Sequence, residues 1–217
     1  MKTLVTLITA LALCVVTPAL AVPVKVIEFS PEAGTAANWH YSGGILSFDE
    51  AVIDKALSAD DDALVGAVVH IPTFEVTGTD GLYTVEPINN EITITNTDGS
   101  VTYFVGTLGD GDLGTIGTVA GVYTKFAGDI TNIVATEAGQ ALGSDALTYL
   151  AGKLPLALDF ELSLQGGSGA GYYSFADMVD GDHTGTGGFS GAMTVPEPAT
   201  MCLLALGGLS LIRRRRA

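Results

Sequence analysis

Apolar and polar residues alternate through much of the middle of the chain, which is the pattern of β-strands with one buried face. The clearest example is the range 156–164, in which Asp159 separates Leu158 from Phe160. Earlier ranges rich in β-branched and aromatic residues are divided by short Gly, Asn and Asp segments, which favour hairpin turns. These ranges are 71–77, 82–88, 91–95 and 101–108. The pattern therefore predicts a meander of antiparallel strands.

Weaker signals extend the meander toward both ends of the chain. Two short β-rich stretches flank Gly43 and Gly44, which predicts a hairpin around these glycines. Additional strands are predicted at 64–70, 122–126, 130–135 and 156–164, and 172–175 and 189–194 are alternatives for final strands. The Gly-rich ranges 109–121 and 181–191 are expected to be loops.

Two short helices complete the predicted elements. Ser47 and Glu50 have the spacing of a capping box, which predicts a helix over 52–57. Ser144 is expected to cap a second helix over 145–150. We therefore predict a mainly β fold, an antiparallel β-sandwich of the jelly-roll type with about 8 to 12 strands and one or two short helices.

Both ends of the chain have the character of targeting segments. Lys2, an apolar run and a final Ala-Leu-Ala at 19–21 are typical of a secretory signal peptide, predicted to be a helix that is removed after Ala21. Near the other end, 199–212 contains 14 residues without a charge and is followed by a basic cluster. That cluster consists of Arg213, Arg214, Arg215 and Arg216.

The uncharged run predicts a C-terminal transmembrane helix that binds the protein to the membrane before processing. At about 1.5 Å per residue it spans roughly 21 Å, and arginine stems lying along the apolar zone extend this reach. A basic cluster beside an apolar span stays on the cytoplasmic side, so the preceding domain is expected to be exported.

Charge is distributed unevenly between these ends and the segment that they enclose. Residues 22–195 contain four lysines, no arginine and 23 of the 24 acidic residues, which leaves a net charge of −19. Such a surface repels nucleic acid and anionic lipid head groups, and it favours divalent cations or hydrated polysaccharide as neighbours. Both cysteines, Cys14 and Cys202, lie in the apolar ends, so no disulfide is expected in the exported domain.

Few residues of this domain have the spacing of a reactive site. The range 109–114 fits Gly-x-Gly-x-x-Gly, but its two aspartates would repel a pyrophosphate and no good helix follows. No other cofactor motif occurs. Carboxylates in this range and near the C-terminal loops offer oxygen ligands that suit Ca²⁺, with solvated surface acids as the alternative. The candidate ligands are Asp110, Asp112, Asp180 and Asp182.

Sequence motifs of enzymes are absent from the exported domain. It contains no Gly-x-Ser-x-Gly elbow, no His-Glu-x-x-His helix, no paired-cysteine metal site and no thiol. We therefore expect a protein that is not an enzyme. A glycosidase with scattered carboxylates stays open as an alternative, because such pairs are defined in space and not by sequence spacing.

The segment before the C-terminal apolar run contains the most specific motif. Pro196 and Pro198 hold Glu197 in an extended conformation, which is the form of peptide that a protease binds. This tripeptide, followed by an apolar helix and an arginine cluster, resembles the PEP-CTERM sorting signal of Gram-negative bacteria. The resemblance implies recognition of Pro196, Glu197 and Pro198 by exosortase, which removes the helix and releases or re-attaches the protein at the surface.

These observations predict three parts: a signal peptide at 1–21, an exported domain at 22–194 and a sorting tail at 195–217. Within the tail, the motif occupies 195–198, the transmembrane helix 199–212 and the basic cluster 213–216. We expect a structural protein of the cell surface or extracellular matrix, associated with exopolysaccharide. The alternative is a carbohydrate- or Ca²⁺-dependent adhesion module.

Overall fold

A computed structural model of the chain describes residues 24–31, 38–79, 82–116, 123–152, 157–165, 175–181 and 183–196. They belong almost entirely to one compact unit, Lys25–Val195. The strands are β1 (Val24–Pro31), β2 (Trp39–Ser42), β3 (Ile45–Phe48), β4 (Ala51–Ala56), β5 (Val68–His70), β6 (Phe74–Thr79), β7 (Leu82–Pro87), β8 (Glu91–Thr95), β9 (Thr102–Ile116), β10 (Tyr123–Ala135), β11 (Leu158–Leu164), β12 (Gly185–Gly187) and β13 (Phe189–Val195). The helices are α2 (Glu137–Ala141), α3 (Asp145–Ala151) and α4 (Phe175–Asp180).

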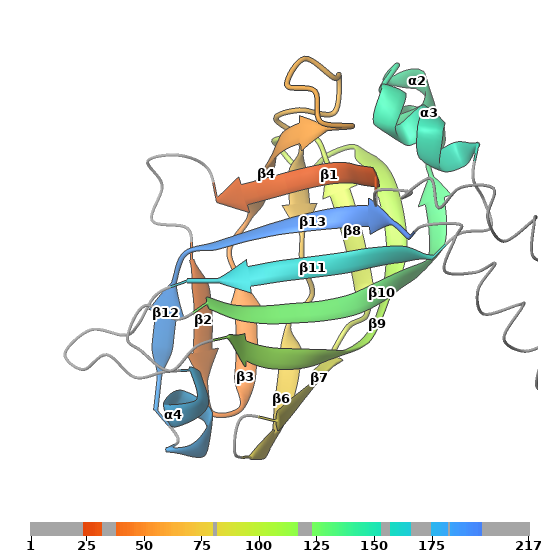
Figure 1. The fold of residues 1–217 in the computed structure, drawn as a ribbon. Coiled ribbons are helices and arrows are strands. Elements are labelled where there is room, and N and C mark those ends of the chain that lie inside the picture. Colours follow the sequence, from red (N-terminus) through yellow and green to blue (C-terminus); the bar gives the residue numbers. More distant parts are fainter. Residues whose placement is uncertain are drawn as a thin grey trace, which may run out of the picture. The chain divides into compact units, whose positions relative to one another are not determined.

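The strands form a closed antiparallel barrel (Figure 1). Eight of them follow one another in the order β10-β11-β13-β1-β4-β5-β8-β9, and β9 pairs with β10 to complete the ring. The remaining strands, β7, β6, β3, β2 and β12, continue the sheet from β9. The last strands of the chain meet its first strands, because β13 lies next to β1 and β12 pairs with β2.

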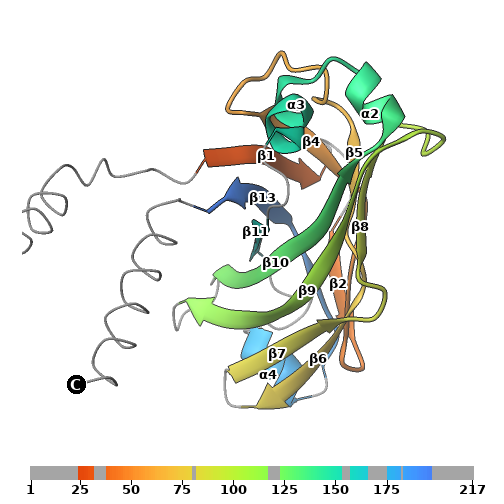
Figure 2. The same cartoon turned by 90° about the vertical axis from the view of Figure 1, so that its right-hand side faces the viewer.

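The predicted sandwich is therefore wrong. Alternation of buried and exposed residues gives each strand one apolar face, and that face suits two packed sheets or one closed sheet equally well. The outcome depends on which strands become neighbours, and here β9 and β10 are long enough to curve around the barrel (Figure 2). Closure also removes the unpaired edges that an open sandwich would expose.

Aromatic side chains fill the interior. Phe126 lies 5.1 Å from Phe74 and 5.9 Å from Phe160 between ring centroids, and Phe160 lies 5.9 Å from Phe29. All four side chains are buried. The described core extends from Val26 to Val195, so it is complete without either terminal segment. The barrel unit therefore has the closed sheet and the core that independent folding requires.

Glycines make room for these rings on the long hairpin. A side chain at Gly111 would overlap the ring of Phe126 and approach the carbonyl oxygen of Ala127 to 2.5 Å. A Cβ at Gly106 would lie 2.5 Å from Cγ2 of Ile130. Because a phenyl ring takes the place of the missing side chain, β9 and β10 stay close packed in spite of their glycines.

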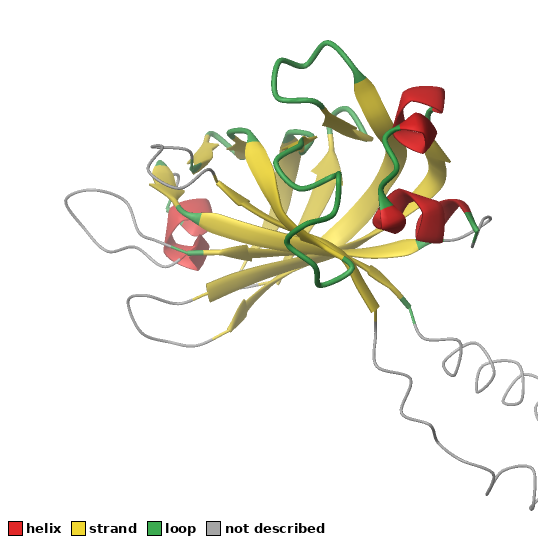
Figure 3. Ribbon diagram, turned by 90° about the horizontal axis from the view of Figure 1, so that it is seen from above, coloured by secondary structure: helices red, strands yellow, loops and turns green. Residues whose placement is uncertain are grey.

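The helices lie at the periphery of the sheet when the barrel is seen from above (Figure 3). Ser144 caps α3 as predicted, since its hydroxyl accepts a hydrogen bond of 3.1 Å from the amide of Leu147. At the other end of the barrel, Met178 of α4 is buried beside Gly185 of β12, where even a Cβ would overlap its sulfur.

Many local predictions are confirmed. Strands occupy the predicted hairpin around Gly43 and Gly44, whose φ values of 57° and 80° are those of a tight turn. The predicted strands at 82–88, 91–95, 156–164 and 189–194 correspond to β7, β8, β11 and β13. Of the range 64–70, β5 includes only Val68–His70.

Other local predictions are wrong. The predicted helix at 52–57 is strand β4, because pairing with β1 and β5 buries Ile53 and Ala56 and outweighs the local capping signal. The Gly-rich range 109–116, predicted as loop, is the second half of β9. Within 181–191, β12 and β13 replace most of the predicted loop.

The predicted signal helix at 1–21 and the predicted transmembrane helix at 199–212 lie outside the described residues. Among the helices that the structure describes, none has both the length and the apolar character needed to cross a membrane.

Candidate functional site

The sorting tail begins directly at the end of the last barrel strand. Thr194 and Val195 belong to β13 and are 7% and 8% exposed, and Thr194 pairs with Asp159 of β11. Pro196, which is half-buried, follows at once. Proline has no N–H and a fixed φ, so it cannot extend the ladder and ends β13 at this residue. The predicted motif is thereby joined to a paired strand without a spacer.

Most of the tail lies beyond this junction and outside the described residues. This holds for Glu197, Pro198 and the arginine cluster Arg213–Arg216. What the structure establishes is therefore the start of the tail at the barrel.

The four predicted Ca²⁺ ligands occupy separate elements. Asp110 is exposed on β9, and Asp112 follows on the same strand with its backbone paired to Ala127 and Thr84. Asp180 is the exposed last residue of α4, and Asp182 lies outside the described residues. Across the described part of the chain, no group of three or more His, Cys, Asp or Glu residues is arranged to hold a metal ion. Calcium binding stays a prediction.

The carboxylate of Asp62 has a structural role. Its oxygens accept hydrogen bonds from the amides of Leu64 at 2.8 Å and Ala146 at 3.1 Å, which ties the 60–62 loop to α3. Burial raises the pKa of this carboxyl, but the hydrogen bonds from Leu64, Ser144 and Ala146 outweigh burial and lower it overall. These hydrogen-bond donors stabilise the carboxylate in its charged form.

Two neighbouring grooves lie on one wall of the barrel. The first, which we call the acidic groove, has a volume of about 450 Å³ and is formed by β7, β9, β10 and β11. Its charged residues are Asp110, Asp129, Asp159 and Glu161. Asp129 and Asp159 are directly opposite each other on β10 and β11. Burial, the charge of Asp129 and the charge of Glu161 raise the pKa of Asp159.

The second groove, which we call the lysine groove, has a volume of about 330 Å³ and crosses β10, β11, β13, β1 and β4. Its charged residues are Lys25, Glu28, Asp54, Lys55, Lys125 and Glu161. Ser163 and Ser190 also line it. Glu161 belongs to both grooves, so the two are adjacent on the outer wall.

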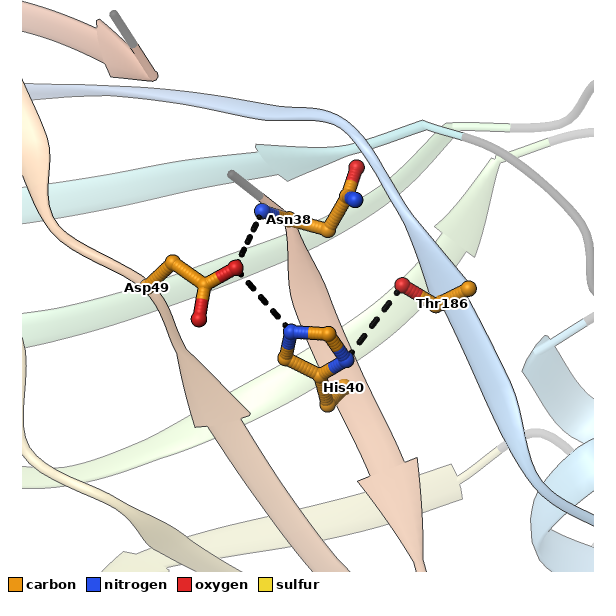
Figure 4. Close-up of polar contacts among 4 residues, drawn as sticks. All are labelled: Asn38, His40, Asp49 and Thr186. Carbon is orange, nitrogen blue, oxygen red and sulfur yellow. Dashed lines mark hydrogen bonds and ion pairs between the residues drawn. The ribbon is translucent and has the colours of Figure 1, made fainter. Parts of the chain in front are cut away.

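A polar cluster joins the first and last parts of the chain (Figure 4). Nε2 of His40 on β2 lies 3.1 Å from Oδ2 of Asp49, and its Nδ1 lies 3.4 Å from Oγ1 of Thr186 on β12. The backbone amide of Asn38 donates to the same Asp49 oxygen at 2.8 Å. This amide, followed by the contact with His40, lowers the pKa of Asp49. We call these four residues the seam cluster.

The seam cluster has the order hydroxyl, imidazole, carboxylate that also occurs in nucleophilic catalysis. Its geometry is less favourable, because the hydroxyl is 3.4 Å from the ring and the side chains of His40 and Asp49 are 49% and 44% exposed. Neither groove is lined by these residues. The cluster connects β2, β12 and the segment after β3, so its evident role is to stabilise the pairing of β2 with β12, which we call the seam.

Sequence reasoning missed both the seam cluster and the lysine groove. His40 and Thr186 are 146 residues apart, and Thr186 lies in a range predicted as loop. Lys25, Lys55 and Lys125 have no common spacing that would indicate a shared groove. Only the order of strands around the barrel brings these residues together.

Comparisons with known proteins identify the tail and leave the barrel without a relative. The family model of the PEP-CTERM protein-sorting motif matches residues 194–216. No curated protein and no solved structure matches the chain. The matched range starts at Thr194, so it includes the last two residues of β13 and the predicted tripeptide. The match implies exosortase as the processing partner and an exported protein that is extracellular or at the cell surface after processing. The chain therefore carries the PEP-CTERM protein-sorting motif at residues 194–216.

Proposed function

We propose that the barrel is a non-enzymatic structural protein of the cell surface or matrix, held in or on the extracellular polysaccharide layer once exosortase has processed its tail. The observation that carries this proposal is the sorting motif placed directly after β13, so that the barrel itself is the cargo. Aromatic side chains fill the barrel interior, which favours a role for the outer surface.

The charge of the cargo supports the same proposal. Residues 22–195 have a net charge of −19, which keeps an exported domain hydrated and apart from anionic lipid head groups. A hydrated polysaccharide layer is compatible with such a surface.

The test is replacement of the motif by Pro196→Ala, Glu197→Ala and Pro198→Ala in the full chain. We expect the unprocessed chain to accumulate and surface retention to be lost, as followed by immunoblotting of surface, medium and membrane fractions. The matched control is Asn89→Ala with Asn90→Ala, two exposed residues between β7 and β8. Normal processing and retention of the motif variant would contradict the proposal.

A carbohydrate- or Ca²⁺-dependent adhesion module is the second candidate, and the acidic groove is the observation in its favour. A glycan array probed with and without Ca²⁺ separates the two functions. Binding to a defined glycan would favour adhesion, whereas a blank array would favour the structural role.

A further inference from the structure

The lysines that the structure describes gather on one wall of the barrel. Lys25, Lys55 and Lys125 are the lysines of the described residues, and all of them line the lysine groove. Glu28, Asp54 and Glu161 line the same groove, so its formal charges balance. The exported segment as a whole carries 23 acids. This groove is therefore a neutral area on a strongly acidic surface.

Two of these lysines are available for a partner. Nζ of Lys25 lies 3.4 Å from Oε2 of Glu28, and both side chains are partly exposed. The side chains of Lys55 and Lys125 form no ion pair or hydrogen bond with any residue in the described ranges. They extend from β4 and β10, and the residues that line the groove between them include the small Ser190 and Ala192 as well as Glu28 and Glu161. The ammonium groups of Lys55 and Lys125 can thus accept a carboxylate-bearing surface.

The adjacent acidic groove has the opposite charge pattern, with carboxylates and no ammonium group. Asp129 and Asp159 are cross-strand neighbours, and like charges in this arrangement repel each other. The acidic groove is lined by four carboxylates and by no lysine. An approaching ammonium group would relieve this repulsion.

From this adjacency we infer that the wall is a self-complementary interface, on which two copies of the barrel associate with the lysine groove of each facing the acidic groove of the other. A two-fold axis lying in the interface, between the two grooves, produces both contacts at once. Another face of this acidic body would meet its copy with charges of the same sign, whereas this wall offers both signs.

The size of the wall is adequate for such an interface. The five adjacent strands β9, β10, β11, β13 and β1 lie side by side on this wall (Figure 1). At about 4.8 Å spacing and with about seven residues each, they cover roughly 550 Å² per copy. Two copies would bury about 1,100 Å², which is at the low end of the range for specific interfaces. The inference goes beyond the proposed function, because it concerns the barrel wall and does not depend on how the tail is sorted.

Charge reversal tests the inference on the barrel unit, residues 22–196. We expect the native unit to change from one chain to two with rising concentration in sedimentation equilibrium. The lysine variant, Lys55→Glu with Lys125→Glu, and the acidic variant, Asp129→Lys with Glu161→Lys, should each have a dimer dissociation constant at least tenfold higher. An equimolar mixture of the two variants should associate again, because each provides the charge that the other has lost.

The matched control is Glu75→Lys with Glu91→Lys. These exposed residues lie on β6 and β8, which contribute to neither groove, and the change in net charge equals that of the acidic variant. The control should dimerise at least as well as the native unit, since it lowers the overall repulsion. Thermal unfolding of each variant establishes that it is folded. A native unit that stays a single chain at about 1 mM, or a mixture that fails to associate, would overturn the inference.

Discussion

Two strand pairings of the sheet, the β9–β10 hairpin and the seam between β2 and β12, differ in the distance along the chain between their partners. In the first, β9 and β10 form a single hairpin paired from Tyr123 with Ile116 to Ala135 with Phe104. In the second, β12 pairs with β2 through only three residue pairs, Gly185–Tyr41, Thr186–His40 and Gly187–Trp39. The hairpin closes a short loop, whereas the seam closes nearly the whole domain, and the entropy of closing a loop rises with its length.

The two pairings also use different interactions. The hairpin depends on glycines that allow phenyl rings to lie against the strands, as Gly111 does for Phe126. The seam depends on anchoring side chains, namely the seam cluster and Trp39, whose Nε1 donates to the carbonyl oxygen of Gln165 at 3.0 Å. The difference suggests that overpacking damages the hairpin most, whereas truncation damages the seam most.

Truncating Trp39 should have the largest effect on the stability of the barrel unit. Trp39 is 1% exposed, so Trp39→Ala removes a large buried side chain and leaves the Gln165 carbonyl without this donor. We expect a loss of about 3–5 kcal/mol in the free energy of unfolding of the barrel unit, measured with urea. Trp39→Phe, which keeps most of the volume, should lose much less. Equal losses in the two variants would show that packing at the seam is not what matters.

Adding a methyl group to the hairpin should have the next largest effect. Gly111→Ala places a Cβ against the Phe126 ring and the Ala127 carbonyl oxygen, which we expect to cost about 1–3 kcal/mol. Gly109→Ala on the same strand is the control, since its Cβ would lie 3.5 Å from the nearest atom, the carbonyl oxygen of Asp129. Urea unfolding of both variants checks the prediction, and similar stabilities would refute the packing argument.

The seam cluster should make a smaller, pH-dependent contribution. The pKa of Asp49 is lowered in the folded state, so its contribution is present above the ordinary aspartate pKa and is lost as the pH falls through the lowered value. Asp49→Asn should therefore lower Tm at neutral pH, by an amount equivalent to at most about 1 kcal/mol for such an exposed pair. The difference from the native unit should disappear in acid. A difference that is independent of pH would argue against the ionic contact.

Removing the charge of Asp159 should have the smallest effect on stability, and this effect should have the opposite sign to that of Asp49→Asn. Its pKa is raised, so the charged form weakens the folded state at neutral pH and this penalty vanishes as the pH falls below the raised value. Asp159→Asn should raise the stability of the monomeric barrel unit at neutral pH by about 0.2–1 kcal/mol, as expected for relief of a cross-strand like-charge pair. Calorimetry at low protein concentration measures this difference, with Asp60→Asn, an exposed residue that lines neither groove, as the control. A lower Tm for Asp159→Asn would count against the repulsion.

Sequence patterns were most informative where the interactions are local. The alternation from Leu158 to Leu164 identified β11 and its buried face, and Ser144 identified the start of α3. The sorting motif was also recognisable, because Pro196, Glu197 and Pro198 are adjacent in the sequence and need no fold to be read. Local signals failed at 52–57, where a capping pattern was overruled by pairing with β1 and β5.

The sequence by itself determined the strands, most turns, the acidic character of the exported segment and the sorting tail. Each of these follows from residues that are neighbours along the chain. Only the tertiary structure decided that the sheet closes into a barrel, that His40 meets Asp49 and Thr186, and that three lysines line one groove. These features depend on which strands become neighbours in the ring, and residues far apart in sequence carry no local sign of that pairing.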